Sequence, residues 1–380
     1  MQVNWVRWLS HEHITDTAVD PAGAIVVAGH SFGDERVEGS PGLFVPRPTL
    51  TRFEAGGDLA TQWAGFEGRT IAVAVDGLGR TYAMLELPND APGESAVFPC
   101  ELRAFDLDDR VRWTKAWETT RCVWPIRVSD GAVVVRIDDT IEVFDLDGEP
   151  QWRRPVPERN HGAPRLGAGS IWITNTASSS FDAPPRAWRY ALNDGHETEI
   201  ALDRSPNFFD TWVVTPDGLL GVSVEGVPPR LYDAELFSLA PNGEERWSRP
   251  LTELPFSDAP GQWRTTHIHV FHRESEIWLT TNEEQIRHDS ADPIHRRMLV
   301  QRRGPRGVPL NTMRRSFEPE PSMFSEHVEG VASVQCPRPT AVPWYGSIAL
   351  GLDGHPDGSV SVYGRQGCRD SFVLYLDVPS

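Results

Sequence analysis

The sequence predicts an all-β fold, a seven-bladed β-propeller of four-stranded blades, from two repeats and an unfinished last copy. The first repeat is a hairpin with an aromatic-x-Leu-Asp turn and a following Trp, as in residues 105–113 and 144–152. The second is an apolar strand, an Asp/Gly turn and another apolar strand, as in residues 71–85. Glycine turns between such strands are a hairpin signal. The last copy of the first repeat, residues 374–377, has no strand after it.

The missing partner of that last copy is expected at the other end of the chain, in residues 3–8. Each second-repeat hairpin is followed by a first-repeat hairpin, so one unit has four strands, which we label A to D. A period of roughly 40–60 residues with four strands is typical of propellers. One domain, 1–380, is expected, because cutting the ring would expose a sheet edge. The expected blades cover residues 14–65, 69–118, 123–157, 162–202, 210–251, 265–317, and 346–378 with 2–9.

Composition fits a turn-rich β protein and narrows the partners. The chain has 32 Gly, 32 Pro and 14 Trp, and 39% of its residues are hydrophobic. The formal net charge is −18, which disfavours nucleic acid, because a phosphate backbone requires a basic surface. The sequence contains no apolar run of the ~18 residues that span a bilayer. We therefore expect a monomer that neither binds nucleic acid nor inserts into a membrane.

The order of strands assigns each connection to one end of the ring. The A–B and C–D turns fall at the bottom end, and the B–C and D–A connections fall at the top end. Six insertions are expected at the top end: residues 31–48, 88–97, 175–186, 252–264, 281–295 and 318–345. Long loops on a rigid scaffold usually carry function, so the top end is the expected functional surface. Drift in loop length is the alternative.

The four cysteines map to the top end as two neighbouring pairs. Proximity favours disulfides Cys100–Cys122 and Cys336–Cys368 among the three possible connectivities. Disulfides indicate an oxidising compartment. The first strand begins at Val3 without a leader, so we expect a secreted, periplasmic or cell-surface protein whose leader has been removed. Four free thiols in a cytoplasmic protein are the alternative.

Titratable residues near the top end are candidates for catalysis or metal binding. An acid–base enzyme needs a His and a carboxylate together, and the candidates are His161 with Glu158, and His327 with Glu326 or Glu329. His267 and His269 lie on one strand face and could bind a metal ion. Hydrogen-bonded histidines between blades are the alternative for this pair.

Four aromatic residues fall in the top insertions: Trp263, Phe324, Trp344 and Tyr345. Flat apolar faces with a polar edge suit a peptide, glycan or protein ligand. Packing of the insertions onto the ring is the alternative.

The clearest copy of the first repeat, residues 140–152, resembles the PQQ-like repeat propellers of bacterial envelopes. The resemblance implies a propeller architecture, and the family includes both quinoprotein dehydrogenases and non-enzymatic assembly or binding lipoproteins. The dehydrogenase repeat carries a Thr-Gly step before its Trp, where this chain has Asp108-Asp109 and Asp147-Gly148. We therefore expect no quinone cofactor, and no other cofactor except a metal ion at the two histidines.

These observations predict a non-enzymatic secreted or cell-envelope binding module that uses its top end. The alternative is a lyase or hydrolase with a His/carboxylate site at the top of the central channel. The two are distinguished by whether such side chains converge on one pocket.

Overall fold

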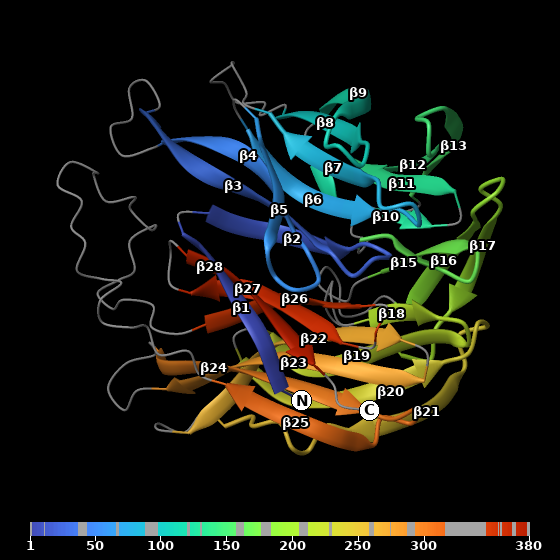
Figure 1. The fold of residues 1–380 in the computed structure, drawn as a ribbon. Coiled ribbons are helices and arrows are strands. Elements are labelled where there is room, and N and C mark those ends of the chain that lie inside the picture. Colours follow the sequence, from blue (N-terminus) through green and yellow to red (C-terminus); the bar gives the residue numbers. More distant parts are fainter. Residues whose placement is uncertain are drawn as a thin grey trace.

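The structure is a computed structural model whose described residues form β-strands, turns and irregular connections. It describes residues 2–377 except 11, 37–43, 66–67, 88–97, 120–121, 130, 157–162, 176–183, 205–211, 228–229, 258–261, 274, 287–292, 316–346, 356, 358 and 367–369. The described residues contain 28 strands in seven four-stranded antiparallel sheets. The predicted all-β, seven-bladed propeller is confirmed, and Figure 1 shows the blades in chain order from blue to red.

The first four blades each use four consecutive strands. Blade 1 consists of β2 (Glu12–Val19), β3 (Ile25–Arg36), β4 (Phe44–Phe53) and β5 (Leu59–Ala64). Blade 2 consists of β6 (Arg69–Val75), β7 (Thr81–Glu86), β8 (Phe98–Phe105) and β9 (Val111–Thr119). Blade 3 consists of β10 (Cys122–Ser129), β11 (Ala132–Ile137), β12 (Thr140–Asp145) and β13 (Pro150–Pro155). Blade 4 consists of β14 (Arg165–Gly167), β15 (Ser170–Thr174), β16 (Arg186–Ala191) and β17 (Glu197–Ala201).

The last three blades include the one that joins the two ends of the chain. Blade 5 consists of β18 (Trp212–Thr215), β19 (Gly218–Val227), β20 (Arg230–Leu239) and β21 (Glu245–Pro250). Blade 6 consists of β22 (Trp263–Arg273), β23 (Glu276–Ile286), β24 (Pro293–Arg303) and β25 (Pro309–Arg315). Blade 7 consists of β26 (Ser347–Gly354), β27 (Val360–Gln366), β28 (Asp370–Asp377) and β1 (Gln2–Ser10).

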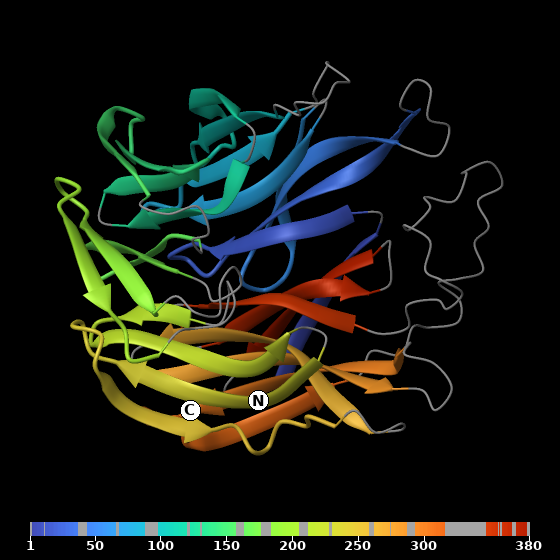
Figure 2. The ribbon, with the colours of Figure 1, turned by 180° about the vertical axis from the view of Figure 1, so that it is seen from behind.

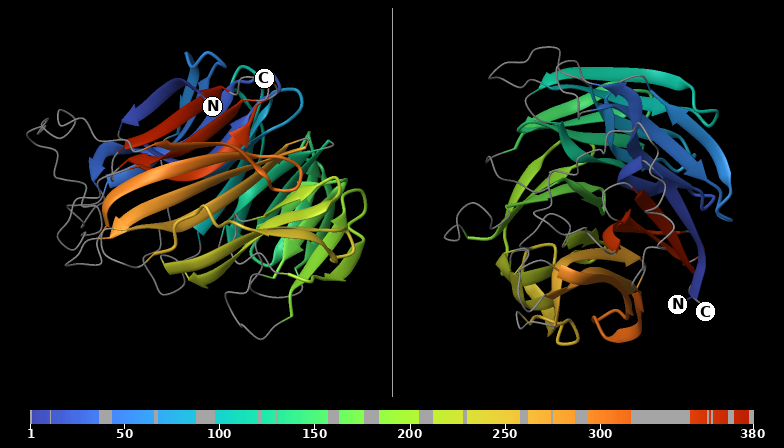
Figure 3. Two further views of the ribbon diagram at one scale, coloured as in Figure 1. Left: turned by 90° about the horizontal axis from the view of Figure 1, so that it is seen from below. Right: turned by 90° about the vertical axis from the view of Figure 1, so that its left-hand side faces the viewer.

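Strand β1 closes the ring, as the sequence predicts. It pairs antiparallel with β28 over its whole length, from Gln2 opposite Asp377 to Ser10 opposite Asp370. The start of β1 and the end of β28 lie side by side in Figures 1 and 3. Trp5 stacks on Tyr375 with ring centroids 5.3 Å apart, so closure also buries a large aromatic contact.

The top end differs in part from the expected insertions. Residues 31–36 and 44–48 continue strands β3 and β4, and residues 281–286 and 293–295 continue β23 and β24. The B–C hairpins of blades 1 and 6 are therefore extended strands for much of the length in which the sequence suggested loops. Figures 1 and 2 show these hairpins pointing to the same side of the molecule. The pairing of β23 with β24 continues along the extension to Ile286 opposite Pro293, and that of β3 with β4 continues to Arg36 opposite Phe44 with an irregularity after Phe32.

The repeated Trp holds neighbouring blades together at the bottom end. Trp113 of blade 2 donates through Nε1 to the Leu146 carbonyl in the C–D turn of blade 3, at 3.1 Å. Trp5 and Trp152 make the same bond to the next turn. The turn residue beneath each indole is a positive-φ glycine: a Cβ on Gly148 would lie 2.8 Å from the Trp113 ring. The glycine is therefore needed both for the backbone conformation of the turn and for close packing of the Trp ring.

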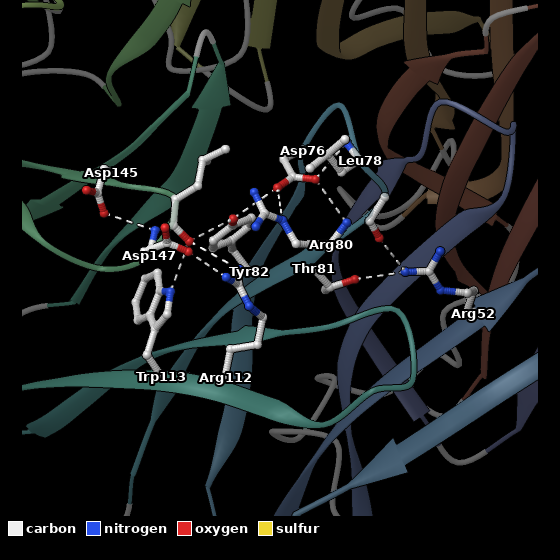
Figure 4. Close-up of polar contacts among 12 residues, drawn as sticks. Arg52, Asp76, Leu78, Arg80, Thr81, Tyr82, Arg112, Trp113, Asp145 and Asp147 are labelled. Carbon is white, nitrogen blue, oxygen red and sulfur yellow. Dashed lines mark hydrogen bonds and ion pairs between the residues drawn. The ribbon is translucent and has the colours of Figure 1, made fainter.

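The interface between blades 2 and 3 is also filled by polar groups, shown in Figure 4. Tyr82 is fully buried and donates its hydroxyl to Asp76 at 3.0 Å. Arg80 pairs with Asp76 at 2.6 Å, and Arg112 pairs with Asp147 of the next blade at 2.6 Å. Burial tends to raise the pKa of Asp76, but hydrogen bonds from Arg80, Leu78 and Tyr82 hold it below its ordinary value. The charges of the two carboxylates, Asp76 and Asp147, are therefore neutralised by the two guanidinium groups of Arg80 and Arg112.

Candidate functional site

Most of the predicted top-end residues lie outside the described residues. These are the catalytic candidates Glu158, His161, Glu326, His327 and Glu329, the aromatic candidates Phe324, Trp344 and Tyr345, and the cysteines Cys336 and Cys368. Their roles remain predictions. Trp263, His269 and Cys100 are described with their side chains, and His267 and Cys122 with their backbones only.

Trp263 lies at the top end of blade 6 as the first residue of β22, not in an insertion. It is half-buried. The Arg297 guanidinium lies over the indole, 3.8 Å from the ring centroid, close enough for a cation–π contact. Trp263 is therefore an aromatic side chain held in place at the rim of the predicted functional surface.

A buried carboxylate fixes the arginine that covers Trp263. Glu283 of β23 is fully buried and forms an ion pair with Arg297 of the neighbouring strand. Arg314 of β25 lies 3.6 Å from the other Glu283 oxygen. A buried charge persists only when it is paired, so Arg297 and Arg314 are held across three strands of the blade. Sequence reasoning missed these residues, although Glu283 and Arg297 lie directly opposite each other in the hairpin.

The two histidines proposed for a metal ion lie in β22. His267 is opposite Asn282, and His269 is opposite Thr280. His269 is partly buried and has an interaction partner. In the described part of the chain, no group of three or more His, Cys, Asp and Glu side chains could hold a metal ion.

Cys100 and Cys122 approach the same part of the core between blades 2 and 3. Cys100 is fully buried in β8, in a cluster that contains Ile137. Cys122, the first residue of β10, pairs through its backbone with Ile137. Cys122 falls between the expected second and third blades, 69–118 and 123–157, but the structure places it in strand β10.

The interface between blades 7 and 1 contains a carboxyl group that the sequence did not single out. Asp353 of inner strand β26 accepts a hydrogen bond from Thr17 of β2. Burial, opposed by the Thr17 hydrogen bond and helped by the nearby Asp16 carboxylate, raises the pKa of Asp353 to about 7. Asp16 itself accepts a bond from the Val73 N–H at 3.1 Å. A carboxyl group that holds its proton near neutral pH can act as a general acid.

His355, two residues later, is almost fully buried. It lies edge-on to Tyr375, with ring centroids 4.6 Å apart. Burial lowers the pKa of His355 to about 4. The backbone N–H groups of Asp20, Asp76 and His355 each donate to the carbonyl four residues later in the A–B turn. His355 therefore occupies the position at which two other blades have Asp, and this departure from the repeat is the sequence signal that could have identified it.

Comparisons with known proteins support the fold only. No family model matches the chain, and no curated protein matches it. A solved structure of the computationally designed Ika8 protein has 8% identity, covers 96% of this chain and 97% of its own, and has a TM-score of 0.50. A protein of unknown function from Bacteroides caccae has 11% identity over 63% of this chain and 82% of its own, with a TM-score of 0.40.

A third solved structure, KlHsv2 with loop 6CD replaced by a Gly-Ser linker, has 10% identity. It covers 75% of this chain and 98% of its own, with a TM-score of 0.42. Separately, the described residues contain no helix that is long and apolar enough to cross a membrane.

Proposed function

We propose that this protein is a non-enzymatic binding module of the secreted or cell-envelope class, and that it binds a peptide, glycan or protein at its top end. The observation that carries the proposal is Trp263, a half-buried indole held at that end by the Arg297–Glu283 pair. A rigid aromatic side chain with a polar edge binds at low entropic cost. Phe324, Trp344 and Tyr345 are the proposed further contacts.

The compartment forms part of the same proposal. The pairs Cys100–Cys122 and Cys336–Cys368 would be disulfides, and the position of Cys122 opposite Ile137, next to the core cluster of Cys100, supports the first. Mass spectrometry of the non-reduced protein should find both cross-links. Four thiols open to alkylation in natively isolated protein would contradict the pairing and the oxidising compartment together. The resemblance to PQQ-like repeats agrees with an envelope protein.

The test is a screen of the protein on glycan and peptide arrays, followed by substitution of Trp263. We expect Trp263→Ala to weaken binding of any hit at least tenfold while the melting temperature changes by only a few degrees. Trp152→Ala is the matched control, because Trp152 joins blades 3 and 4 at the bottom end. It should lower the melting temperature and leave binding intact.

The predicted top insertion gives a second set of variants. Combined alanine substitution of Glu326, His327 and Trp344 should abolish binding without unfolding the protein. A hit that binds the Trp263 and insertion variants as tightly as the parent would place binding elsewhere.

A lyase or hydrolase is a second candidate because Asp353, near the end of β26, is a buried carboxyl group with a pKa of about 7. Its position beside an A–B turn would put the acid toward the bottom end and not at the top of the channel. The group would be the proton donor, with Asp16 as its charged neighbour. Asp353→Asn should then abolish turnover of a substrate found by an activity screen and leave array binding unchanged. Turnover that survives this substitution would exclude Asp353 as the acid.

A further inference from the structure

A cavity of about 450 Å³ lies between blades 5 and 6. Leu220, Ser238 and Trp247 line it from blade 5, and His272, Ile277 and Arg306 line it from blade 6. All of these residues lie near A–B or C–D turns, so the cavity is at the bottom end. This is the end opposite to the proposed binding surface.

The strand registers show which residues of blades 2 and 5 are equivalent. In blade 2, Tyr82 lies opposite Ala104, which lies opposite Trp113. In blade 5, Leu220 lies opposite Ser238, which lies opposite Trp247. Both rows end in the repeated Trp at the face that packs on the next blade. The cavity therefore occupies the position that the Tyr82 ring fills between blades 2 and 3.

Two further differences involve carboxylates. Val75 pairs with Thr81 and Val214 pairs with Leu219, so Asp76 and Thr215 occupy the same position after those strand residues. In the next blade, Asp147 and Arg306 each precede the turn glycine that faces the Trp. The interface between blades 5 and 6 thus has Thr in place of one Asp, and Arg in place of the other.

Two arginines, Arg246 and Arg306, and one carboxylate, Asp217, line the cavity, so a small excess of positive charge remains. Arg112 pairs with Asp147. Arg246 also precedes the repeated Trp, but the position equivalent to Asp147 is occupied by Arg306, which lines the same cavity. Arg246 instead lies 3.4 Å from Asp217, whose side chain is 75% exposed. Within the part of the chain that the structure describes, Arg306 has no ion pair. Burial lowers the pKa of His272, although Asp217 opposes this shift, so His272 is neutral at pH 7.

We propose that this cavity binds a small organic oxyanion, a carboxylate or a phosphate ester that carries an apolar group. Arg246 and Arg306 would hold the oxyanion, because guanidinium groups match carboxylate and phosphate geometry. Trp247, Leu220 and Ile277 would pack on the apolar group. A volume of this size is typical of small-molecule sites. The net charge of the chain is −18, so a site that attracts anions is not expected from the composition. This contrast favours a binding role for the two arginines of the cavity.

The test uses isothermal titration calorimetry with phenyl phosphate, benzoate and inorganic phosphate, and phenol as the neutral control. The parent protein should bind phenyl phosphate or benzoate, and should bind phenol and inorganic phosphate at least tenfold more weakly. Arg306→Asp should weaken binding by at least tenfold, because it removes one charge-assisted contact and adds a repulsive charge. Arg112→Ala changes the residue of blade 2 that is equivalent to Arg246, and it should change affinity by less than twofold.

A second variant refills the cavity with the residues found at the interface between blades 2 and 3. The combined substitution T215D, L220Y and R306D should abolish binding and retain the native circular dichroism spectrum. If this variant does not fold, Arg306→Asp alone decides. The proposal is overturned if the parent binds neither organic anion at millimolar concentration, or if Arg306→Asp binds them as tightly as the parent. Because Trp263 is at the other end of the ring, failure here would leave the proposed top-end function untouched.

Discussion

The interfaces between blades 2 and 3 and between blades 5 and 6 occupy the same position in the propeller and have the same repeated Trp. In the first, the Tyr82 ring fills the space, Asp76 pairs with Arg80 and Asp147 pairs with Arg112 (Figure 4). In the second, Leu220 leaves a cavity, and Arg306 stands where the partner of an arginine would be. Both interfaces keep the Trp and the glycine below it, whereas the residues around them differ.

The largest expected effect comes from emptying the filled interface. Tyr82→Leu removes a fully buried ring and leaves Asp76 without one hydrogen bond, so the free energy of unfolding should fall by about 3–4 kcal/mol. Urea denaturation measures it. Leu220→Tyr, the reciprocal change, should cost less than about 1 kcal/mol because the cavity can accept the ring. Equal losses in the two variants would refute the difference between the interfaces.

A third interface, between blades 7 and 1, should respond to pH through two opposed groups. The pKa of His355 is about 4 in the folded protein against 6.5 when unfolded. Between these values the unfolded chain binds more protons, so this residue makes stability fall as pH is lowered, by up to about 3 kcal/mol. The pKa of Asp353 is about 7 against 3.8. Its contribution is present at low pH and is lost as pH rises through 7.

Single variants separate these two contributions. Asp353→Asn leaves only His355, so stability should fall as pH is lowered from 6.5 to 4. His355→Gln leaves only Asp353, so stability should rise over the same range. Denaturation curves at several pH values measure both slopes. Slopes of the same sign in the two variants would show that other groups dominate.

The glycine below the repeated Trp should matter for two separable reasons. Gly148→Ala places a Cβ 2.8 Å from the Trp113 ring at a φ of +86°, and we expect a loss of about 2–3 kcal/mol. Gly131 has a similar φ of +81° and open space around it, so Gly131→Ala should cost only about 1 kcal/mol of backbone strain. The difference in melting temperature measures the Trp contact. Identical losses would mean that backbone strain alone requires the glycine.

The smallest expected effect is a gain. Asp109 has the turn position of Gly148 and a positive φ of 57°, a conformation that a side chain disfavours. The Trp of blade 1, Trp63, packs edge-on against Phe105, which is compatible with a larger residue in this turn. Asp109→Gly should raise stability by up to about 1 kcal/mol, as measured by urea denaturation. A loss instead would mean that the Asp109 side chain contributes a contact of its own.

The fold could be predicted from the sequence because its signals are local and repeated. Gly turns, the Phe-x-Leu-Asp hairpins and the unfinished last copy each specify pairing with a neighbouring strand, and β1 was the one long-range inference required. The hollow interface could not be predicted in this way. Leu220 and Arg306 belong to different blades, and only the register across both sheets brings them to one cavity.

The repeat also conceals substitutions that reverse its chemistry. Arg303 stands in blade 6 where Phe144 stands in blade 3, and it is fully buried, donating to the Gly307 carbonyl at 2.7 Å and paired with Glu253. A pattern of apolar positions would assign an aromatic residue there. The top-end candidate was found only in part: Trp263 was recognised as an aromatic side chain, but the buried Glu283 that fixes its arginine was not. A buried charge cannot be predicted from its own strand, because the partners that stabilise it come from other strands.

The pairing of β1 with β28 has a consequence for synthesis of the protein on the ribosome. Gln2 can form its native pairing only after Asp377 has been synthesised. At a synthesis rate of about 5–20 residues per second this delay lasts roughly 20–75 s. Blades 1 to 6 can form in order during that time, each on the surface of the one before it. Blade 7 cannot, so its sheet is the part of the ring whose completion is limited by translation and whose open edge most needs protection by a chaperone.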